Sequence, residues 1–418
     1  MPSEVSLQTT LNRTIFQTLP SVQKVYVLIH VAPTGEAALG QMPLNFGLVL
    51  DRSGSMAGDK INKLREAVKL ALGQMGAQDL ISVVLFDDKV DVLVPSQPLT
   101  DGTRLQSQVG QIVDRGGTSI SKGMRKGLDE IRRGIASNRV SRMLLLTDGE
   151  TYGDEEQCKQ IAQECGAAGV PITALGLGDE WNSELLDAIA QQSGGQSDQL
   201  VAPDQIVREF QQTISSMQGT VAKNANLTLR LVAGVTPAAA WRVLPQISRL
   251  DARSLSDRDV QIALGDLERG VGQSVLVELV VQPKPAGSYR IAQVDVSYDL
   301  LAGATGEHVR QDILLALTDN QAQVGPFNPD VMNLVEKVSV FKLQTRALSE
   351  AQAGNIGMAT QQLRAAATRL LNLGEVELAQ AAQQEAANLE QQGQMSAAGT
   401  KKLHYGTRKL TQRLDDLS

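Results

Sequence analysis

The sequence is poor in aromatic residues and in charge, and it contains no long apolar run. Phenylalanine, tryptophan and tyrosine make up 3% of the 418 residues and charged residues 20%, so leucine, valine, isoleucine and alanine must fill the cores. No stretch of about eighteen consecutive apolar residues occurs, which argues against an integral membrane segment. Residues 1–8 carry neither the basic nor the apolar region of a secretory signal, so we expect a cytoplasmic protein.

Cysteine is scarce, and acidic residues outnumber basic ones. Cys158 and Cys165 lie in one predicted helix, about 10 Å apart at about 1.5 Å per residue, which is too far for a disulfide. Two reduced thiols are typical of a cytoplasmic chain. The formal net charge of −7 argues against nucleic acid as a partner, because nucleic-acid binding depends on positively charged surfaces.

A chain of this length is expected to form two or three domains. From about residue 43 to 218, short apolar strands alternate with amphipathic helices, which predicts a mostly parallel sheet covered on both faces. Residues 80–86 and 90–94 are too close in sequence for a crossover helix, so they should pair antiparallel. In chain order we predict an N-terminal strand region, this α/β domain, a β-sandwich domain and a set of helical hairpins, at residues 1–40, 41–218, 219–326 and 327–418.

The segment after Gly219 shows about five short strands separated by turn residues, which indicates a β-sandwich. Five strands are few for a closed sandwich, and the β-rich run at 22–32 would supply another. We therefore predict that the α/β domain is inserted in the β-sandwich. The last segment is rich in alanine and glutamine with glycine at three breaks, and it predicts four helices, at 329–352, 355–372, 375–392 and 396–414.

Oxygen-bearing side chains follow three predicted strands or loops of the α/β domain. Asp51, Ser53 and Ser55 come directly after a buried apolar strand, Thr118 follows a Gly-Gly pair, and Asp148 ends another strand. Ligands of open α/β sheets bind at the carboxyl ends of the strands, so these side chains should meet there. Small, hard oxygen ligands suit Mg²⁺, with Mn²⁺ and Ca²⁺ as the alternatives.

The motifs Asp-x-Ser-x-Ser, Gly-Gly-Thr-Ser and Thr-Asp-Gly, in this order over residues 43–218, resemble the von Willebrand factor A (VWA) domain with its metal-ion-dependent adhesion site. The resemblance implies a doubly wound, Rossmann-like sheet with one antiparallel edge strand. It also implies that serine and threonine hydroxyls contact the metal directly. The two aspartates of the motif contact the metal directly or through water, and here we expect mainly the contact through water. The implied ligand set is Ser53, Ser55 and Thr118, supported by Asp51 and Asp148.

Such a site donates little charge, because three of its five groups are neutral hydroxyls. An incompletely neutralised cation with an open position attracts a carboxylate, so we expect a protein partner that supplies an aspartate or glutamate. The layout of the whole chain is similar, more loosely, to bacterial cytosolic VWA proteins. That resemblance implies a MoxR-type ATPase as one partner.

Other interpretations compete with this one. Taken alone, Asp-x-Ser-x-Ser is usually a capped turn, and we expect Asp59, Asp87 and Asp88 to be solvated turn residues. A Mg²⁺-dependent phosphohydrolase would use Asp51 as nucleophile, but no positioned lysine or histidine acid and no glycine-rich phosphate loop is evident. An accessory subunit of a membrane channel or transport complex is a third reading, which the lack of a signal or membrane segment disfavours.

Overall fold

A computed structural model describes residues 4–34, 42–99, 102–300 and 305–412. The described chain forms two compact units. One is the α/β unit, with residues 42–220, and the other contains residues 4–34, 221–300 and 305–412.

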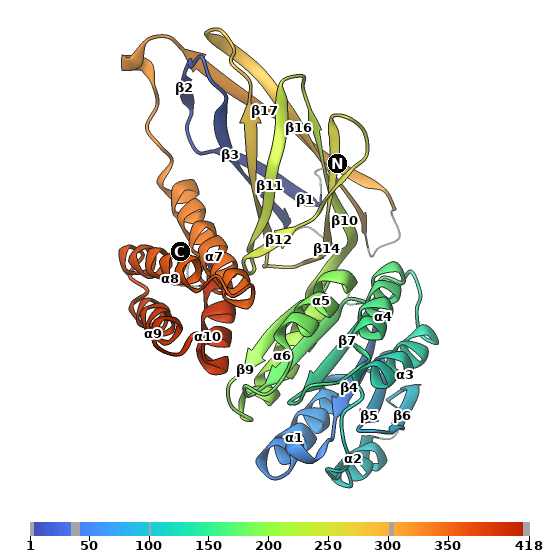
Figure 1. Ribbon diagram of the computed structural model, residues 1–418. Coiled ribbons are helices and arrows are strands. Elements are labelled where there is room, and N and C mark those ends of the chain that lie inside the picture. The colour runs from blue at the N-terminus through green and yellow to red at the C-terminus, as the bar shows by residue number, and fades with distance from the viewer. Residues whose placement is uncertain (1–3, 35–41, 100–101, 301–304, 413–418) are drawn as a thin grey trace. The chain divides into compact units, whose positions relative to one another are not determined.

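The α/β unit is built on one six-stranded sheet of order β6-β5-β4-β7-β8-β9 (Figure 1). The strands are Leu44–Asp51 (β4), Leu80–Phe86 (β5), Val90–Pro98 (β6), Val140–Thr147 (β7), Ile172–Leu177 (β8) and Gln196–Leu200 (β9). Every pair is parallel except β5 with β6, which is antiparallel as predicted for residues 80–94. All eight residues of β4 are buried, which explains why its sequence is a continuous apolar run rather than an alternating one.

Helices cover both faces of this sheet. They are Asp59–Gln74 (α1), Gly102–Gly110 (α2), Ile120–Arg132 (α3), Glu155–Ala167 (α4), Ser183–Ser193 (α5) and Gln205–Gly219 (α6), with a short 3-10 turn at Gly54–Met56 (η1). Helices α1, α2 and α6 share one core with alternate residues of β4. On the other face α3 approaches β4 closely, because Gly127 leaves no side chain between the helix and Val49: a Cβ there would lie 2.3 Å from Val49 Cγ2.

The two cysteines lie on α4 and are buried free thiols. Burial raises the pKa of both thiols, that of Cys165 to about 12. Neither thiol is ionised near neutral pH, so both act as small apolar core residues.

The second unit begins with a β-sandwich of two sheets, of order β1-β3-β15-β11-β12 and β13-β14-β10-β16-β17-β2. Its longer strands are Val5–Leu11 (β1), Gln23–Pro33 (β3), Thr220–Leu231 (β10), Val235–Leu244 (β11), Asp259–Glu268 (β14), Gln273–Val281 (β15), Gly287–Leu300 (β16) and Glu307–Thr318 (β17). The short ones are Ile15–Gln17 (β2), Ser248–Leu250 (β12) and Ala252–Ser254 (β13). Because β3 pairs antiparallel with β15, the N-terminal strands belong to the sandwich, and the predicted insertion of the α/β domain is confirmed.

Strand β11 is missing from the sequence-based prediction, whose five strands after Gly219 lie at 224–232, 258–264, 272–282, 289–299 and 307–317. Its segment Pro237-Ala-Ala-Ala has low β-propensity. Pairing with the strongly apolar β15 holds it in the sheet nonetheless, with Trp241 opposite Leu276. Tertiary pairing therefore overrides a weak local signal.

Four helices complete the second unit: Pro329–Gln352 (α7), Ile356–Asn372 (α8), Val376–Gln392 (α9) and Ala397–Arg408 (α10). Asn328 caps α7, since its side chain accepts hydrogen bonds from the backbone N–H groups of Asp330 and Val331. The apolar stripe of α7 shares a core with Trp241 and Leu276 of the sandwich. The predicted helical region is confirmed, although the last two residues of its fourth helix, 413 and 414, lie outside the described part of the chain.

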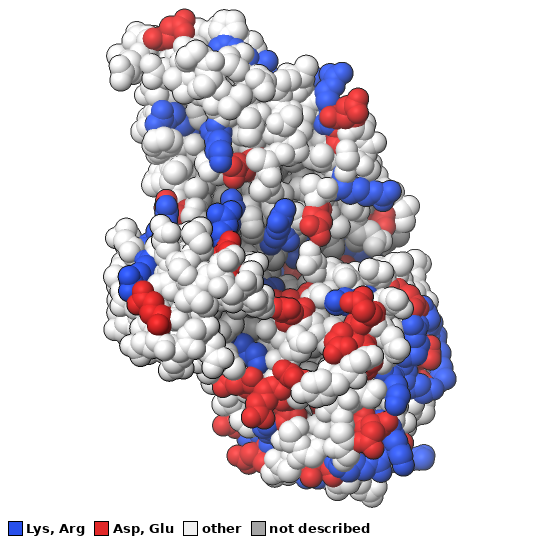
Figure 2. Space-filling model, viewed as in Figure 1, with Lys and Arg blue, Asp and Glu red and all other residues white. Residues whose placement is uncertain are grey.

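Charged side chains are intermingled over the α/β unit on the face shown in Figure 2, with acidic and basic groups as neighbours. No helix within the described residues has both the length and the apolar character needed to cross a membrane.

Candidate metal centre

Strand β4 ends in a buried carboxylate, Asp51, that has no cationic partner in the described part of the chain. Asp51 is fully buried. Its Oδ1 accepts a hydrogen bond from the Ser53 backbone N–H (2.7 Å) and its Oδ2 one from Thr147 Oγ1 (2.5 Å). Among the residues that the structure describes, no lysine, arginine or histidine pairs with it. Burial raises the pKa of the Asp51 carboxyl to about 6, although the hydrogen bonds from Thr147 and Ser53 oppose the rise.

A chain of hydroxyls links this loop to the end of β7. Ser53 Oγ lies 3.0 Å from Ser55 Oγ, and Ser55 Oγ donates to Asp148 Oδ1 at 2.7 Å. Ser53 is buried and Ser55 is exposed, so these two linked hydroxyls lead from the interior to the surface. The carboxylates of Asp51 and Asp148 lie close enough for the charge of Asp148 to raise the pKa of Asp51 further.

Thr118 lies beside these groups, on the loop before α3. A carbon atom built as Cβ on Gly149 would be 3.4 Å from Thr118 Oγ1 and 3.8 Å from Ser55 Oγ, so both hydroxyls face this glycine. In the described part of the chain, the Thr118 hydroxyl has no hydrogen-bond partner. All five residues singled out in the sequence therefore meet at the carboxyl edge of the sheet, and their binding of a metal stays a prediction.

Lys60, in the first turn of α1, is a component that the sequence did not reveal. Its Nζ lies 2.5 Å from Asp148 Oδ2, and the Asp148 side chain has no solvent exposure. The sequence indicated no lysine acid at this site, and the structure places Lys60 there as the ion-pair partner of Asp148. The only signal was that Lys60 follows the Asp-x-Ser-x-Ser motif by five residues, and its partner lies 88 positions away.

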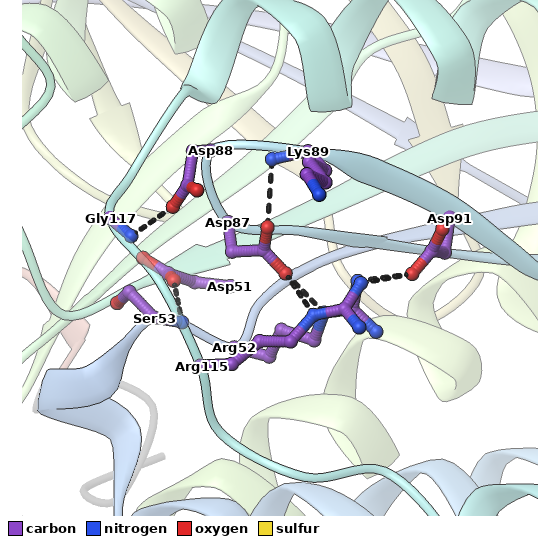
Figure 3. Close-up of polar contacts among 9 residues, drawn as sticks. All are labelled: Asp51, Arg52, Ser53, Asp87, Asp88, Lys89, Asp91, Arg115 and Gly117. Atoms are coloured by element: carbon purple, nitrogen blue, oxygen red, sulfur yellow. Dashed lines mark hydrogen bonds and ion pairs between the residues drawn. The ribbon is translucent and has the colours of Figure 1, made fainter.

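A cluster of ion pairs lies at the turn between β5 and β6 (Figure 3). Asp87, at the end of β5, accepts hydrogen bonds from Arg52 Nε at 2.7 Å and Arg115 Nε at 3.0 Å, and both guanidinium groups also bond to Asp91. Burial alone would raise the pKa of Asp87, but the hydrogen bonds from Lys89, Arg115 and Arg52 hold it below its usual value. Asp87 is 1% exposed, so the expectation of a solvated turn residue is wrong.

Backbone hydrogen bonds extend this cluster into a clamp on the Thr118 loop. Arg115 N–H donates to the Arg52 carbonyl at 2.8 Å, and Gly54 N–H to the Gly116 carbonyl at 3.1 Å. Ser119 N–H donates to the Asp87 carbonyl at 3.0 Å. Asp88 is exposed as expected, and its carboxylate accepts from the Gly117 N–H (Figure 3). The loop that carries Thr118 is thus held on both sides of this residue, by the loop after β4 and by the turn after β5.

The donor set suits a hard divalent cation. It offers three hydroxyl oxygens and two carboxylates, one of them buried without a counter-charge, and Mg²⁺ prefers oxygen ligands. Within the described ranges, no three histidine, cysteine, aspartate or glutamate side chains gather into a metal cage. A cation at this edge would therefore depend on hydroxyl ligands.

Two family models match the chain. Residues 45–213 match the von Willebrand factor type A domain, and residues 329–413 match the Sll0103-like, C-terminal alpha-helical domain. Protein sll0103 of Synechocystis sp. is 29% identical over 279 residues, 65% of each chain. The inter-alpha-trypsin inhibitor heavy chain H3 of Rattus norvegicus is 29% identical over 182 residues, 41% of this chain and 20% of that protein. The chain thus spans about two thirds of the first relative and a fifth of the second.

A solved structure shares the fold over nearly the whole chain. The von Willebrand factor type A protein from Catenulispora acidiphila superposes with a TM-score of 0.78, at 16% identity, over 96% of both chains. The sheet order of the α/β unit, its single antiparallel edge strand and the matched residues 45–213 agree with one another. This chain therefore contains a von Willebrand factor type A domain at residues 45–213 and a Sll0103-like, C-terminal alpha-helical domain at residues 329–413.

Proposed function

We propose that the chain is a non-catalytic protein-interaction module that binds a partner carboxylate through a divalent cation, Mg²⁺ first among the candidates. The observation that carries the proposal is Asp51, a fully buried carboxylate without a cationic partner among the described residues, at the head of a chain of hydroxyls. A buried charge without a counter-charge is costly, and a divalent ion at this edge would offset that cost.

The residues that would hold the cation are those on the three loops. The hydroxyls of Ser53, Ser55 and Thr118 would face it, with Asp51 and Asp148 supplying negative charge. When bound, the cation supplies a coordination position and an excess of positive charge for one aspartate or glutamate of the partner. The ion pairs of Asp87 with the two arginines support a role in metal binding. They help to hold the Thr118 loop without using the proposed ligand groups themselves.

The geometry favours binding over phosphoester hydrolysis. Both oxygens of Asp51 accept hydrogen bonds from the protein, and its side chain is closed off from solvent, so a substrate phosphorus has no access to it. Lys60 is held by Asp148 rather than aimed at a leaving group. The buried free thiols support a cytoplasmic location, and a MoxR-type ATPase is the first partner to test.

The test is a pull-down with the purified full chain in Mg²⁺ and in EDTA. We expect wild-type protein to retain its partner in Mg²⁺ and lose it in EDTA, and Asp51→Ala to lose it in both. Asp59→Ala is the control, because Asp59 is an exposed aspartate in the first turn of α1 and should bind like wild type. Partner binding that is indifferent to both EDTA and Asp51→Ala would overturn the proposal.

A further inference from the structure

The two carboxylates of the candidate metal centre are neutralised unequally. Asp51 has no cation within the described chain, whereas Asp148 is paired with Lys60. Asp148 Oδ2 accepts from Lys60 Nζ and Oδ1 from Ser55 Oγ, so each oxygen has a partner. Lys60 itself is about one third exposed and reaches inward from the surface of α1.

The position of Lys60 in its helix is electrostatically unfavourable. It is the second residue of α1, where the aligned peptide dipoles place partial positive charge and favour acidic side chains. Asp59, the preceding residue, fits that preference, but Lys60 does not. Its compensation is the fully buried Asp148 carboxylate, to which it brings a cation from an adjacent element.

We propose that Lys60 is a built-in cation of this centre. It neutralises Asp148 in the metal-free protein and lowers the affinity of the centre for a divalent ion. The inference rests on the proposed function, since it concerns the same centre. Lys60 reduces the charge of the two carboxylates from −2 to −1 before any metal arrives. The protein thereby avoids two unpaired buried carboxylates when cation is scarce.

Two opposing effects on metal affinity can be ranked. Lys60 fixes the orientation of Asp148, which favours binding, and it adds a like charge close to the incoming cation, which opposes it. The repulsion acts at short range in a partly buried site, where screening is weak, whereas the ordering benefit concerns one short side chain. The repulsion therefore dominates, and the bound ion retains more positive charge for the carboxylate of a partner.

The experiment compares Mg²⁺ affinity, measured by calorimetry, and thermal unfolding for the full chain and its variants. We expect Lys60→Met to lower the melting temperature in EDTA and to tighten the Mg²⁺ dissociation constant by about tenfold, the effect of removing one nearby like charge. Lys60→Gln serves as a second neutral variant. Lys60→Arg keeps the charge and should remain near wild type.

Lys63→Met is the matched control. Lys63 lies one turn further along α1, its side chain is 31% exposed against 32% for Lys60, and it pairs with Glu66 and Asp204 away from the centre. We expect wild-type Mg²⁺ affinity for this variant.

Each outcome decides a different point. Neutral variants at Lys60 that lose stability but bind Mg²⁺ no more tightly than wild type would reduce Lys60 to a structural ion pair and overturn the inference alone. If neither wild type nor these variants bind Mg²⁺, Mn²⁺ or Ca²⁺, the proposed function fails and this inference fails with it. Binding by Lys60→Met without binding by wild type would support the effect of Lys60 on metal affinity and overturn the proposed function of the wild-type chain.

Discussion

Two buried aspartates at the ends of neighbouring strands have opposite electrostatic environments. Asp51 ends β4 and Asp87 follows β5, with Asp51 in register with Phe86, and both are at most 1% exposed. Against the effect of burial, hydrogen bonds from the Lys89 backbone N–H and from two arginines hold the pKa of Asp87 below its usual value, whereas burial raises the pKa of Asp51 to about 6. This sheet edge therefore pairs one buried carboxylate with its own cations and leaves the other without a cationic partner among the described residues, which is the basis of the proposed metal site (Figure 3).

Removing the charge of Asp87 should have the largest effect on stability. Asp87→Asn leaves Arg52, whose side chain is 7% exposed, with Asp91 as its one acidic partner among the described residues. Breaking a buried ion pair typically costs a few kcal/mol, so we expect a loss of about 3 kcal/mol in the free energy of unfolding, measured by urea denaturation in EDTA. Asp88→Asn, at the adjacent exposed position, should cost much less. Equal losses for the two variants would mean that the buried cluster is not the stabilising element.

Asp295 of the β-sandwich extends the comparison to a second aspartate with its own cations. Burial raises its pKa, but hydrogen bonds from His308 and Arg310 outweigh burial and lower it overall. A lowered carboxyl pKa contributes stability above the unfolded value of about 3.9, and this contribution is lost as pH falls through the folded pKa. We expect Asp295→Asn to cost about 1.5 kcal/mol at pH 7, with a smaller difference from wild type at acid pH.

Urea denaturation of both proteins at pH 7 and at pH 3 checks this expectation. A difference that grows as pH falls would contradict the assignment, because it would require a raised rather than a lowered pKa for Asp295.

Asp51→Asn should change stability in the opposite direction from Asp87→Asn. In EDTA at pH 7.5 the substitution removes a buried charge that no cation balances. The oxygen of the asparagine side chain can still accept a hydrogen bond from the Ser53 N–H, and its amide group can form a hydrogen bond with the Thr147 hydroxyl. We expect a gain of about 1 kcal/mol in the free energy of unfolding, together with loss of calorimetric Mg²⁺ binding. A variant that is less stable in EDTA and still binds Mg²⁺ would refute both halves of the comparison.

Gly149→Ala should weaken Mg²⁺ binding with the smallest change in the free energy of unfolding among these variants. The new methyl group would lie 3.4 Å from Thr118 Oγ1 and 3.8 Å from Ser55 Oγ, which is ordinary van der Waals contact. We expect less than about 0.5 kcal/mol change in unfolding free energy, but at least tenfold weaker Mg²⁺ binding, because the methyl group lies against two of the proposed ligand hydroxyls. Unaltered Mg²⁺ affinity would place the cation away from Gly149.

The sequence was informative where a residue's role depends on nearby residues. The apolar run before Asp51, the Gly-Gly pair before Thr118 and the strand ending at Asp148 each announce a strand end or loop, and parallel strands bring such ends to one edge. The insertion of the α/β domain followed from counting strands, because a sandwich lacking strands needs others from elsewhere in the chain.

The roles of Lys60, Arg52 and Arg115 were not predictable in this way. Their partners lie 24 to 88 positions away in sequence, and a charged residue beside a turn has the same local pattern whether it is solvated or paired. Asp87 shows the consequence, since an aspartate in a hairpin turn is usually solvated and this one is buried between two guanidinium groups.

The pairing of β3 with β15 also sets an order of events during synthesis. Val31 pairs with Gln273, so β3 leaves the ribosome long before the strand that completes its sheet. At the usual rate of about 5–20 residues per second, the interval is roughly 12–50 s, long enough for the intervening α/β domain to fold first. Throughout that interval the hairpin of β1 and β3 presents an unpaired edge, which is a site of aggregation until β15 arrives.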